Sequence, residues 1–369
     1  MQVKPKIAFV FQNSPNSRDF DRFFINNFKK NGFSLLILDI SEVLKQPYIN
    51  SDFTVSKNLV KCKNILEIFI QLFKFKPNYI FIFVNKIMIR CYFKRLFIVN
   101  ITNIFFQTIE YCGPNGPFGN LRKKKYSLLN KLLFKYPYKS TKYSIVSGSE
   151  SLKNASGSPI FLHTTDYDVY LKSLKKNTST ENINYLLFLD EDYVFHEDYA
   201  IIGMEPPVTA ENYYSEVNFM LKRLGELLGS QPIIKVHPSA DRKLAKKFYD
   251  FPLSEDKTID AVKDAKLVVS HDSTALQMAV FCNKPVILLE TTEIIASEYY
   301  HPQIQRFAKA LGCSVLTIED FNRDIQFPVI CEESYAQYMN DYIKTDLSDQ
   351  RYSYEILASF LQNQVSTKN

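Results

Sequence analysis

The sequence alternates short apolar runs with segments whose apolar residues recur at helical spacing, and this pattern constrains the fold more than any other feature. Lys6–Phe11 predicts a strand, and four phenylalanines between residues 20 and 28 follow it at helical spacing. The pattern begins again at Tyr185–Leu189, before a long helix expected at Ala210–Leu228. Strands that alternate with helices indicate parallel sheets covered on both faces, so the expected fold class is α/β.

A polar stretch at Lys172–Asn184 separates the two runs of alternating elements and predicts a linker. The 369 residues are also more than one hydrophobic core usually serves. We therefore expect an N-terminal Rossmann-like domain at residues 1–178, a C-terminal Rossmann-like domain at residues 179–330, and closing helices at residues 331–369. The two domains would face a cleft, and the closing helices would pack back on the first domain.

The remaining elements follow from the same patterns. Strands are expected at Phe33–Leu38, Tyr79–Val84, Ile101–Phe106, Tyr143–Val146, Pro159–Leu162, Pro232–Val236, Leu267–Val269, Pro285–Leu289 and Ser314–Ile318. Helices are expected at Ile65–Phe75, Arg242–Tyr249, Thr258–Ala265, Thr274–Phe281, Ile304–Leu311, Glu333–Ile343 and Tyr352–Asn363.

Composition limits how the chain could bind a phosphate and indicates the cellular compartment in which it is found. The chain has 10 glycines and neither GxGxxG nor GxxxxGK[ST], so hydroxyls, helix ends and histidine would have to replace a glycine-rich loop. The 6 scattered cysteines form no CxxC or zinc spacing, which favours reduced thiols. No signal peptide and no apolar stretch of about 18 residues is evident. We expect a cytoplasmic protein, with peripheral binding to the inner membrane as a further expectation.

Positive charge is concentrated between Lys86 and Lys142, where twelve Lys and Arg residues accompany one acid, Glu110, with aromatic residues between them. Such a region could face anionic lipid or an acidic acceptor, and an ordinary solvated basic face is the simpler explanation. Nucleic acid is not an expected partner, because no recognised nucleic-acid-binding module is present.

Two polar clusters follow apolar runs in the second half of the chain. Lys235-Val236-His237-Pro238 ends one run, and His271-Asp272-Ser273-Thr274 ends the next. At the carboxyl ends of neighbouring parallel strands, these residues would meet where open α/β sheets bind ligands. The hydroxyls and His237 suit a phosphate. In the simpler alternative, His237 is a loop histidine and Ser273 an N-cap.

Acidic residues follow the first strand of the second domain. Asp190, Glu191 and Asp192 come directly after Tyr185–Leu189, and crowded carboxylates raise one another's pKa, which suits a general base. A solvated acidic turn is the alternative. Asp166 and Asp168 are a second candidate pair, for which an exposed turn before a helix at Val169–Leu174 is the favoured explanation.

These motifs carry a family resemblance. Lys235–Pro238, Asp272–Thr274 and Leu187–Asp190 resemble motifs of bacterial GT-B glycosyltransferases that use CMP-activated keto-sugars: sialic, pseudaminic or legionaminic acid, or Kdo. The resemblance covers mainly Asn184–Glu290. It implies that His237, Ser273 and Thr274 bind the donor phosphate, and that an acid, for which we select Asp190, takes the acceptor proton during an inverting displacement.

The other candidate residues have supporting roles. Pro238, Asp272 and Glu290 are expected beside the donor nucleotide, and Glu290 with Thr291 and Thr292 could reach its ribose. Secondary candidates are Glu191, Asp192, Lys235 and His271, of which His271 is either structural or a donor contact. Asp190-x-Asp192 and Asp166-x-Asp168 match a metal motif formally. The resemblance nevertheless implies no metal and no cofactor.

The expected function is an inverting, metal-independent transfer of a nonulosonic acid or Kdo-type sugar from a CMP donor. The acceptor would be a bacterial surface glycan or a lipid-linked molecule. Alternatives within the enzyme class are a CDP-glycerol or CDP-ribitol phosphotransferase and a UDP-hexose transferase. An alternative outside it is a non-catalytic glycan- or membrane-binding module.

Overall fold

The computed structural model describes residues 4–46, 58–84, 91–113, 116–118, 139–175, 185–196, 199, 205–323, 325–345 and 351–366. The chain forms two compact units. Unit 1 comprises Met1–Gly113, Arg122–His163 and Asp346–Asn369, and unit 2 comprises Pro114–Leu121 and Thr164–Thr345. The main division lies at residues 163/164 rather than at the expected 178/179. Its cause is the helix α7 (Thr165–Leu174), whose Tyr167 and Tyr170 rings pack on Phe281 of unit 2.

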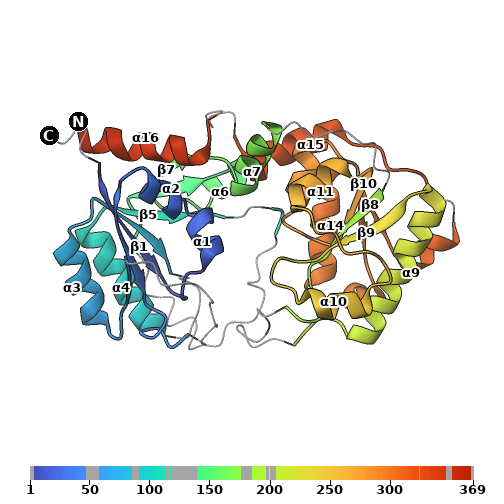
Figure 1. The fold of residues 1–369 in the computed structure, drawn as a ribbon, viewed down its shortest axis with the longest axis horizontal. Coiled ribbons are helices and arrows are strands. Elements are labelled where there is room, and N and C mark those ends of the chain that lie inside the picture. Colours follow the sequence, from blue (N-terminus) through green and yellow to red (C-terminus); the bar gives the residue numbers. More distant parts are fainter. Residues whose placement is uncertain are drawn as a thin grey trace. The chain divides into compact units, whose positions relative to one another are not determined.

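Unit 1 contains a parallel sheet in the order β3-β2-β1-β4-β5-β6-β7 (Figure 1). Its strands are β1 (Lys6–Phe11), β2 (Ser34–Asp39), β3 (Leu59–Lys61), β4 (Tyr79–Phe83), β5 (Thr108–Tyr111), β6 (Tyr143–Val146) and β7 (Ser158–Phe161). Its helices are α1 (Ser17–Arg22), α2 (Ile25–Lys30), α3 (Ile65–Phe75), α4 (Tyr92–Phe105), α6 (Ser149–Leu152) and α16 (Ser353–Ser366). The strand order reverses at β1, as in doubly wound sheets.

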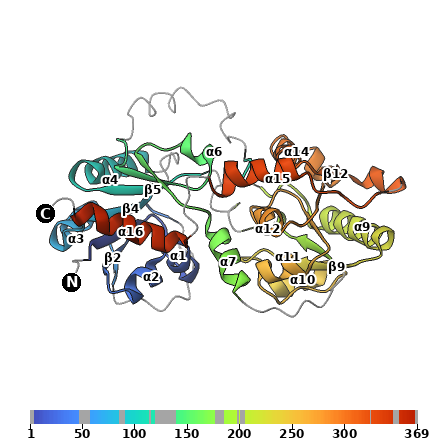
Figure 2. The same ribbon diagram turned by 90° about the horizontal axis from the view of Figure 1, so that it is seen from above.

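Alternating side chains of β1 enter two different cores of unit 1. Phe9 packs in one core with Phe28 of α2 and Leu357 of α16. Val10 packs in the other with Leu72 of α3 and Val99 of α4. Because successive strand residues point to opposite faces, the sheet is covered on both sides, as the fold class requires. Figure 2 shows α16 lying near α1 and α2 on the first of these faces.

The expected strand at Ile101–Phe106 is wrong, because residues up to Phe105 belong to helix α4. Buried Ile98, Val99 and Thr102 recur at helical spacing, and the Thr102 hydroxyl donates to the Ile98 carbonyl at 2.6 Å. The next strand, β5, begins at Thr108. A short apolar run does not distinguish a buried helix from a buried strand, and here the helix formed.

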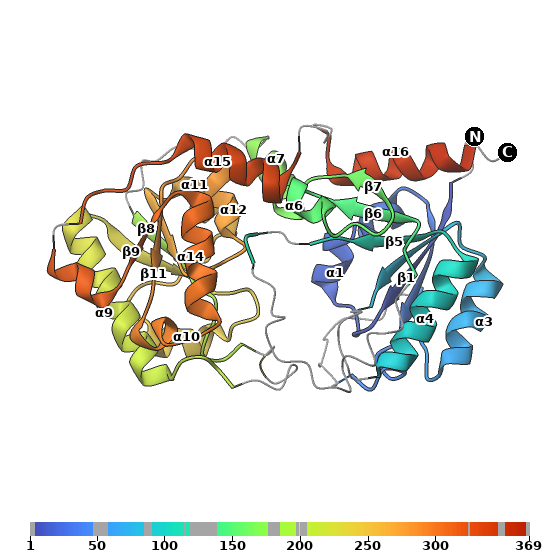
Figure 3. The same ribbon diagram turned by 180° about the vertical axis from the view of Figure 1, so that it is seen from behind.

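Unit 2 contains a second parallel sheet in the order β12-β11-β10-β8-β9 (Figure 3). Its strands are β8 (Tyr185–Leu189), β9 (Gln231–Lys235), β10 (Leu267–Ser270), β11 (Val286–Leu289) and β12 (Ser314–Leu316). Besides α7, its helices are α9 (Ala210–Leu228), α10 (Arg242–Phe248), α11 (Thr258–Asp264), α12 (Leu276–Phe281), α13 (Thr292–Ile295), α14 (Tyr300–Leu311), η2 (Ile318–Asn322), α15 (Glu332–Tyr338) and η3 (Met339–Ile343). All of β8 is buried, and the strand order reverses between β8 and β10.

The two closing helices belong to different units. Leu357 and Leu361 of α16 are fully buried in unit 1, where the Tyr79 hydroxyl donates to the Leu361 carbonyl at 3.3 Å. Helix α15 instead packs in unit 2, where the Tyr335 hydroxyl donates to the Lys284 carbonyl at 2.6 Å. The expectation that closing helices return to the first domain therefore holds for α16 and is wrong for α15.

No helix within the described part of the chain is both long enough and apolar enough to cross a membrane.

The burial of α16 predicts a large cost for truncating one of its core residues. Leu357→Ala removes a fully buried side chain and should lower the free energy of unfolding of unit 1 by about 2–5 kcal/mol. Urea unfolding followed by circular dichroism measures this loss. The control, Leu152→Ala, truncates a leucine that is 40% exposed. Equal effects of the two substitutions would contradict the packing described for α16.

Candidate functional site

The sequence-predicted residues of unit 2 gather at the carboxyl ends of four adjacent strands. Asp190 follows β8, His237 lies just beyond β9, His271 follows β10 and Glu290 follows β11. The four strands pair in parallel, so their carboxyl ends share one edge of the sheet. The order reverses between β8 and β10, and in open α/β sheets this switch point is where ligands bind. The edge therefore forms the candidate site.

Asp190 is buried beneath this edge. The carboxyl is 4% exposed, and its Oδ1 accepts from the Asp192 backbone N–H at 3.0 Å. Burial raises the pKa of Asp190 to about 6, against the opposing effect of the hydrogen bond from the Asp192 backbone. Asp190 can therefore exchange a proton near neutral pH. The same burial leaves it little contact with solvent.

The carboxyl groups of Glu191 and Asp272 are close enough at the switch point for the charge of one to act on the other. Burial raises the pKa of Glu191 well above its usual range; the Asp272 charge raises it further, and a hydrogen bond from the Ser273 hydroxyl lowers it. Burial also raises the pKa of Asp272 to about 6, although the Tyr193 hydroxyl, which donates to its Oδ1, opposes this. Glu191 is partly buried and Asp272 is buried. Two neighbouring carboxyls whose charges repel retain protons more readily than isolated ones.

His271 supports the site from inside the core. It is fully buried, with Nδ1 at 2.7 Å from the Leu289 carbonyl and Nε2 at 3.0 Å from the Tyr213 hydroxyl. A carbonyl only accepts, so Nδ1 carries the proton and Nε2 accepts from Tyr213. Burial lowers the pKa of His271 to about 4, so the ring is neutral at neutral pH. Both ring nitrogens are used by the protein, which is the arrangement of a structural histidine.

His237 lies in a turn after β9. The Ala240 backbone N–H donates to the His237 carbonyl at 2.9 Å, and Pro238 occupies the second position of this turn, which its fixed φ favours. The Ser239 backbone N–H donates to His237 Nδ1 at 3.4 Å, and the Ser239 hydroxyl lies 2.7 Å from the same nitrogen. These contacts make Nδ1 an acceptor, so the neutral ring carries its proton on Nε2.

A second imidazole accompanies His237. The ring of His196, from the loop after β8, lies with its centroid 4.8 Å from that of His237. His196 follows Asp190, Glu191 and Asp192 in the sequence, where no pattern indicates a role for it. Only folding brings it beside a residue 41 positions away, so no local pattern could have identified the pair.

The hydroxyl cluster after β10 differs from the expected helix start. Helix α12 begins at Leu276, and Ser273 Oγ accepts from the Ala275 backbone N–H at 3.1 Å. Ser273 is buried, whereas Thr274 is exposed. The helix expected from Thr274 therefore starts two residues later, because Thr274 and Ala275 form the preceding turn.

Glu290 is occupied by contacts within unit 2. It is 2% exposed; its Oε1 lies 2.8 Å from His301 Nδ1, and its Oε2 accepts from Gln305 at 3.1 Å. Burial raises the pKa of Glu290, and the hydrogen bond from His301 lowers it. Thr291 caps α13, and the Thr292 backbone N–H donates to Glu216 at 2.7 Å.

The side chains of the remaining candidates are placed as follows. The Lys235 ammonium donates to the Asp256 carbonyl, and Asp192 is a buried turn residue with a left-handed φ of 54°. Asp166 and Asp168 lie in the first turn of α7, not in an exposed turn before it. Asp166 accepts from the Gln277 amide at 2.7 Å and Asp168 is buried, so the expectation of an exposed turn is wrong.

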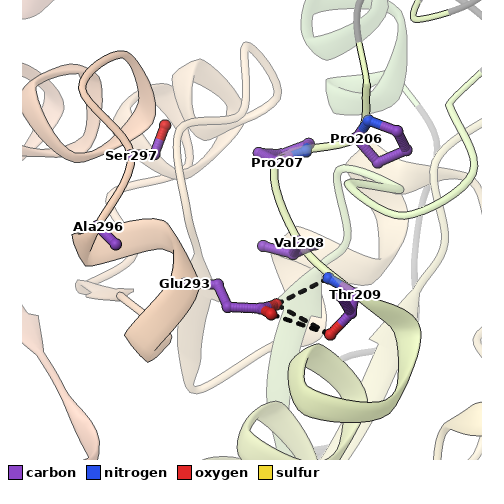
Figure 4. A pocket seen from close by; sticks show the side chains of 7 residues that line it. All are labelled: Pro206, Pro207, Val208, Thr209, Glu293, Ala296 and Ser297. Carbon is purple, nitrogen blue, oxygen red and sulfur yellow. Dashed lines mark hydrogen bonds between the residues drawn. The ribbon is translucent and has the colours of Figure 1, made fainter.

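A pocket of about 360 Å³ lies near the start of α9 and α13, which follow β8 and β11 (Figure 4). It is lined by Pro206, Pro207, Val208, Thr209, Glu293, Ala296 and Ser297. The Glu293 carboxylate accepts from the Thr209 backbone N–H at 2.7 Å and from the Asn212 amide at 2.9 Å. Burial would raise the pKa of Glu293, but these hydrogen bonds outweigh it and lower that pKa. None of the sequence-predicted residues lines this pocket.

Within the described ranges, no group of three or more His, Cys, Asp and Glu side chains is arranged to hold a metal ion. The expected metal independence stays a prediction.

The burial of Asp190 predicts a pH-dependent stability difference between the wild type and Asp190→Asn. The folded pKa is raised from 3.8 to about 6, so the folded state binds the extra proton between these values. Ionising Asp190 then destabilises the wild type as pH rises through that window. The neutral variant escapes this loss, so its stability relative to the wild type should rise between pH 4 and pH 7 by up to about 3 kcal/mol. Urea titrations at both pH values measure the difference, and a pH-independent one would contradict the buried carboxyl.

No family model and no curated protein matches the sequence. Solved structures match its fold. The wall teichoic acid polymerase TagF is 10% identical, with a TM-score of 0.52 over 100% of this chain and 90% of that chain. The S. aureus MnaA–UDP complex is 13% identical, with a TM-score of 0.50 over 98% of this chain and 97% of that chain. The likeness is one of fold: two parallel-sheet α/β domains of the GT-B type.

Proposed function

We propose that this chain is a GT-B glycosyltransferase that takes a sugar from a nucleotide donor at the carboxyl edge of the unit 2 sheet. The observation that carries the proposal is the set of side chains at that edge: acids after β8, imidazoles from the loops after β8 and β9, and hydroxyls after β10. The site combines proton acceptors with phosphate ligands, which is what nucleotide-sugar transfer needs. Fold likeness to a protein bound to UDP supports the proposal.

The proposed donor is a CMP-activated nonulosonic acid or Kdo-type sugar, on the strength of Lys235–Pro238 and Asp272–Thr274. His237 Nε2–H would donate to the donor phosphate, with His196 beside it, and the hydroxyls of Ser273 and Thr274 would donate to the same group. Glu290 would accept from a ribose hydroxyl. A carboxylate has about four acceptor positions, of which His301 and Gln305 occupy two.

In the proposed reaction Asp190 takes the proton of the acceptor hydroxyl. The acceptor oxygen attacks the anomeric carbon from the side opposite the phosphate, the bond between that carbon and the phosphate oxygen breaks, and CMP leaves with the electron pair. The configuration inverts. The raised pKa of Asp190 suits a base near neutral pH. Glu191, next to Ser273 and Asp272, is the second candidate for this role. No metal or cofactor is proposed.

The proposed acceptor is a bacterial surface glycan or a lipid-linked molecule, and the proposed location is the cytoplasm, with peripheral binding to the inner membrane. The free cysteines support a reducing compartment. Eight of the twelve basic residues at Lys86–Lys142 lie outside the described residues.

Two alternatives each rest on one observation. A UDP donor is favoured by the fold likeness to the MnaA–UDP complex, and a CDP-glycerol or CDP-ribitol phosphotransferase by the likeness to a wall teichoic acid polymerase. A non-catalytic glycan- or membrane-binding module is favoured by the low exposure of Asp190, at 4%.

The donor class can be identified by thermal shift with CMP, CDP, UMP, UDP, TDP and GDP. A ligand that binds only the folded state raises the melting temperature, and we expect selective stabilisation by CMP. His237→Ala should weaken CMP binding about tenfold or more, because a hydrogen bond to a charged phosphate is lost. His196→Ala should weaken it less, and Lys246→Ala, which removes an exposed charge from α10, serves as control. Unchanged CMP affinity in folded His237→Ala would refute the phosphate role.

Asp190→Asn tests the base. The substitution keeps the acceptor oxygen for the Asp192 backbone N–H but removes the basic carboxylate, so transfer from a CMP-keto-sugar should fall at least about a hundredfold with CMP affinity unchanged. Glu191→Gln is the matched comparison. If Glu191→Gln loses transfer and Asp190→Asn does not, Glu191 is the base. Loss of wild-type activity in EDTA would contradict the metal-free reaction, and absence of turnover with every nucleotide sugar would favour the binding module.

A further inference from the structure

Helices α3 and α4 of unit 1 have an apolar outer surface. Seven large apolar side chains on these helices are between 49% and 69% exposed: Leu66, Ile70, Phe73, Phe93, Phe97, Ile104 and Phe105. Surface helices normally place polar residues on the outer side and bury the apolar stripe. Here the inner side is apolar too, since Ile68, Leu72 and Val99 are fully buried against the sheet. The outer apolar stripe is therefore additional to what the core needs.

The two helices lie side by side, so the exposed side chains form one surface (Figures 1 and 3). Ring contacts join them: Phe69 and Phe97 have centroids 6.1 Å apart, and Phe73 and Phe105 have centroids 5.8 Å apart. On α3, Leu66, Ile70 and Phe73 are spaced by four and three residues and share one stripe. We call these seven side chains the α3–α4 face. Large apolar side chains that gather on one exposed surface, and are not scattered singly, mark a contact with a partner or a membrane.

The charges around the α3–α4 face have one predominant sign. Lys63, Lys74, Lys76 and Lys94 are exposed on or next to the two helices. Between Lys63 and Lys76, and between Cys91 and Phe106, the one acidic residue is Glu67. Its carboxylate is engaged at the start of α3, where it accepts from the Lys63 backbone N–H at 2.7 Å and from the Asn64 amide at 2.8 Å. Lysines thus outnumber acids on the two helices that carry the aromatic surface.

We propose that the α3–α4 face docks on an anionic lipid surface, with its phenylalanines in the headgroup region and its lysines on the phosphates. This combination suits a lipid interface, where apolar burial and attraction to anionic headgroups add. A two-fold contact with a second copy would bring the same patch against itself and set the lysine rows near each other. The face shares α4 and Lys94 with the basic region at Lys86–Lys142 and extends beyond that region through α3. The proposal does not depend on the sugar donor.

Sedimentation of the full chain with vesicles tests the docking. Binding should be strong to equal parts of phosphatidylcholine and phosphatidylglycerol, weak to phosphatidylcholine alone, and reduced by salt. Leu66→Glu/Phe93→Glu changes the most exposed large apolar residue of each helix, and Phe73→Glu/Phe97→Glu changes one further exposed phenylalanine of each. Each pair should require at least about tenfold more lipid for half-maximal binding. Lys63→Gln/Lys74→Gln should lower affinity about fivefold per lysine at low salt.

Phe327→Glu/Val329→Glu is the matched control, because it places the same two negative charges on residues of unit 2 that are 40% and 89% exposed. It should bind vesicles like the wild type. Circular dichroism establishes that each variant is folded, and the thermal shift with CMP should be the same in all of them, which separates docking from nucleotide binding. The proposal is overturned if the wild type ignores anionic vesicles, or if folded Leu66→Glu/Phe93→Glu still binds them fully. It is also overturned if light scattering shows a wild-type dimer and a monomeric Leu66→Glu/Phe93→Glu variant while vesicle binding is the same in both. The face would then bind a second copy of the chain.

Discussion

A neutral imidazole buried at the end of β10 holds the candidate site together. His271 joins the Leu289 carbonyl of β11 to the Tyr213 hydroxyl of α9, and the Tyr193 ring stacks on it with centroids 5.1 Å apart. Tyr193 in turn donates to Asp272. One side chain thus fixes the distance between two strands, a helix and the loop that bears the acids. A buried polar group is costly when unsatisfied, so this arrangement is stable only with both ring nitrogens bonded.

Carboxyl groups set around that imidazole acquire properties that exposed acids lack. Asp190 and Asp272 are buried and Glu191 is partly buried, and loss of solvent is the largest cause of the raised pKa in all three. Burial of this kind costs stability and provides proton exchange near neutral pH, a combination characteristic of functional sites. Tyr193 offsets part of the cost by donating to Asp272.

The sequence was sufficient to place the candidate residues at one sheet edge, because each apolar run that ends in a polar cluster became a strand followed by a loop. It was insufficient where the outcome depended on distant residues. Asp190 is covered by Tyr249 and lies near Tyr213, which come from other elements. The His196–His237 pair and the apolar outer side of α3 arise in the same way from tertiary packing. The error at Ile101–Phe106 has a different origin, since the run carries no signal that separates a helix from a strand.

The division of the chain between the units has a consequence for its synthesis. Unit 1 begins with the first strand and is completed by α16, near the other end of the chain. During translation, all of unit 2 emerges before α16 can cover Phe28 and Tyr79. One apolar face of the nascent N-terminal sheet therefore stays incompletely covered until α16 is synthesised. Chaperones bind intermediates that expose such surfaces. Unit 2, continuous apart from a short segment, can reach its native core first.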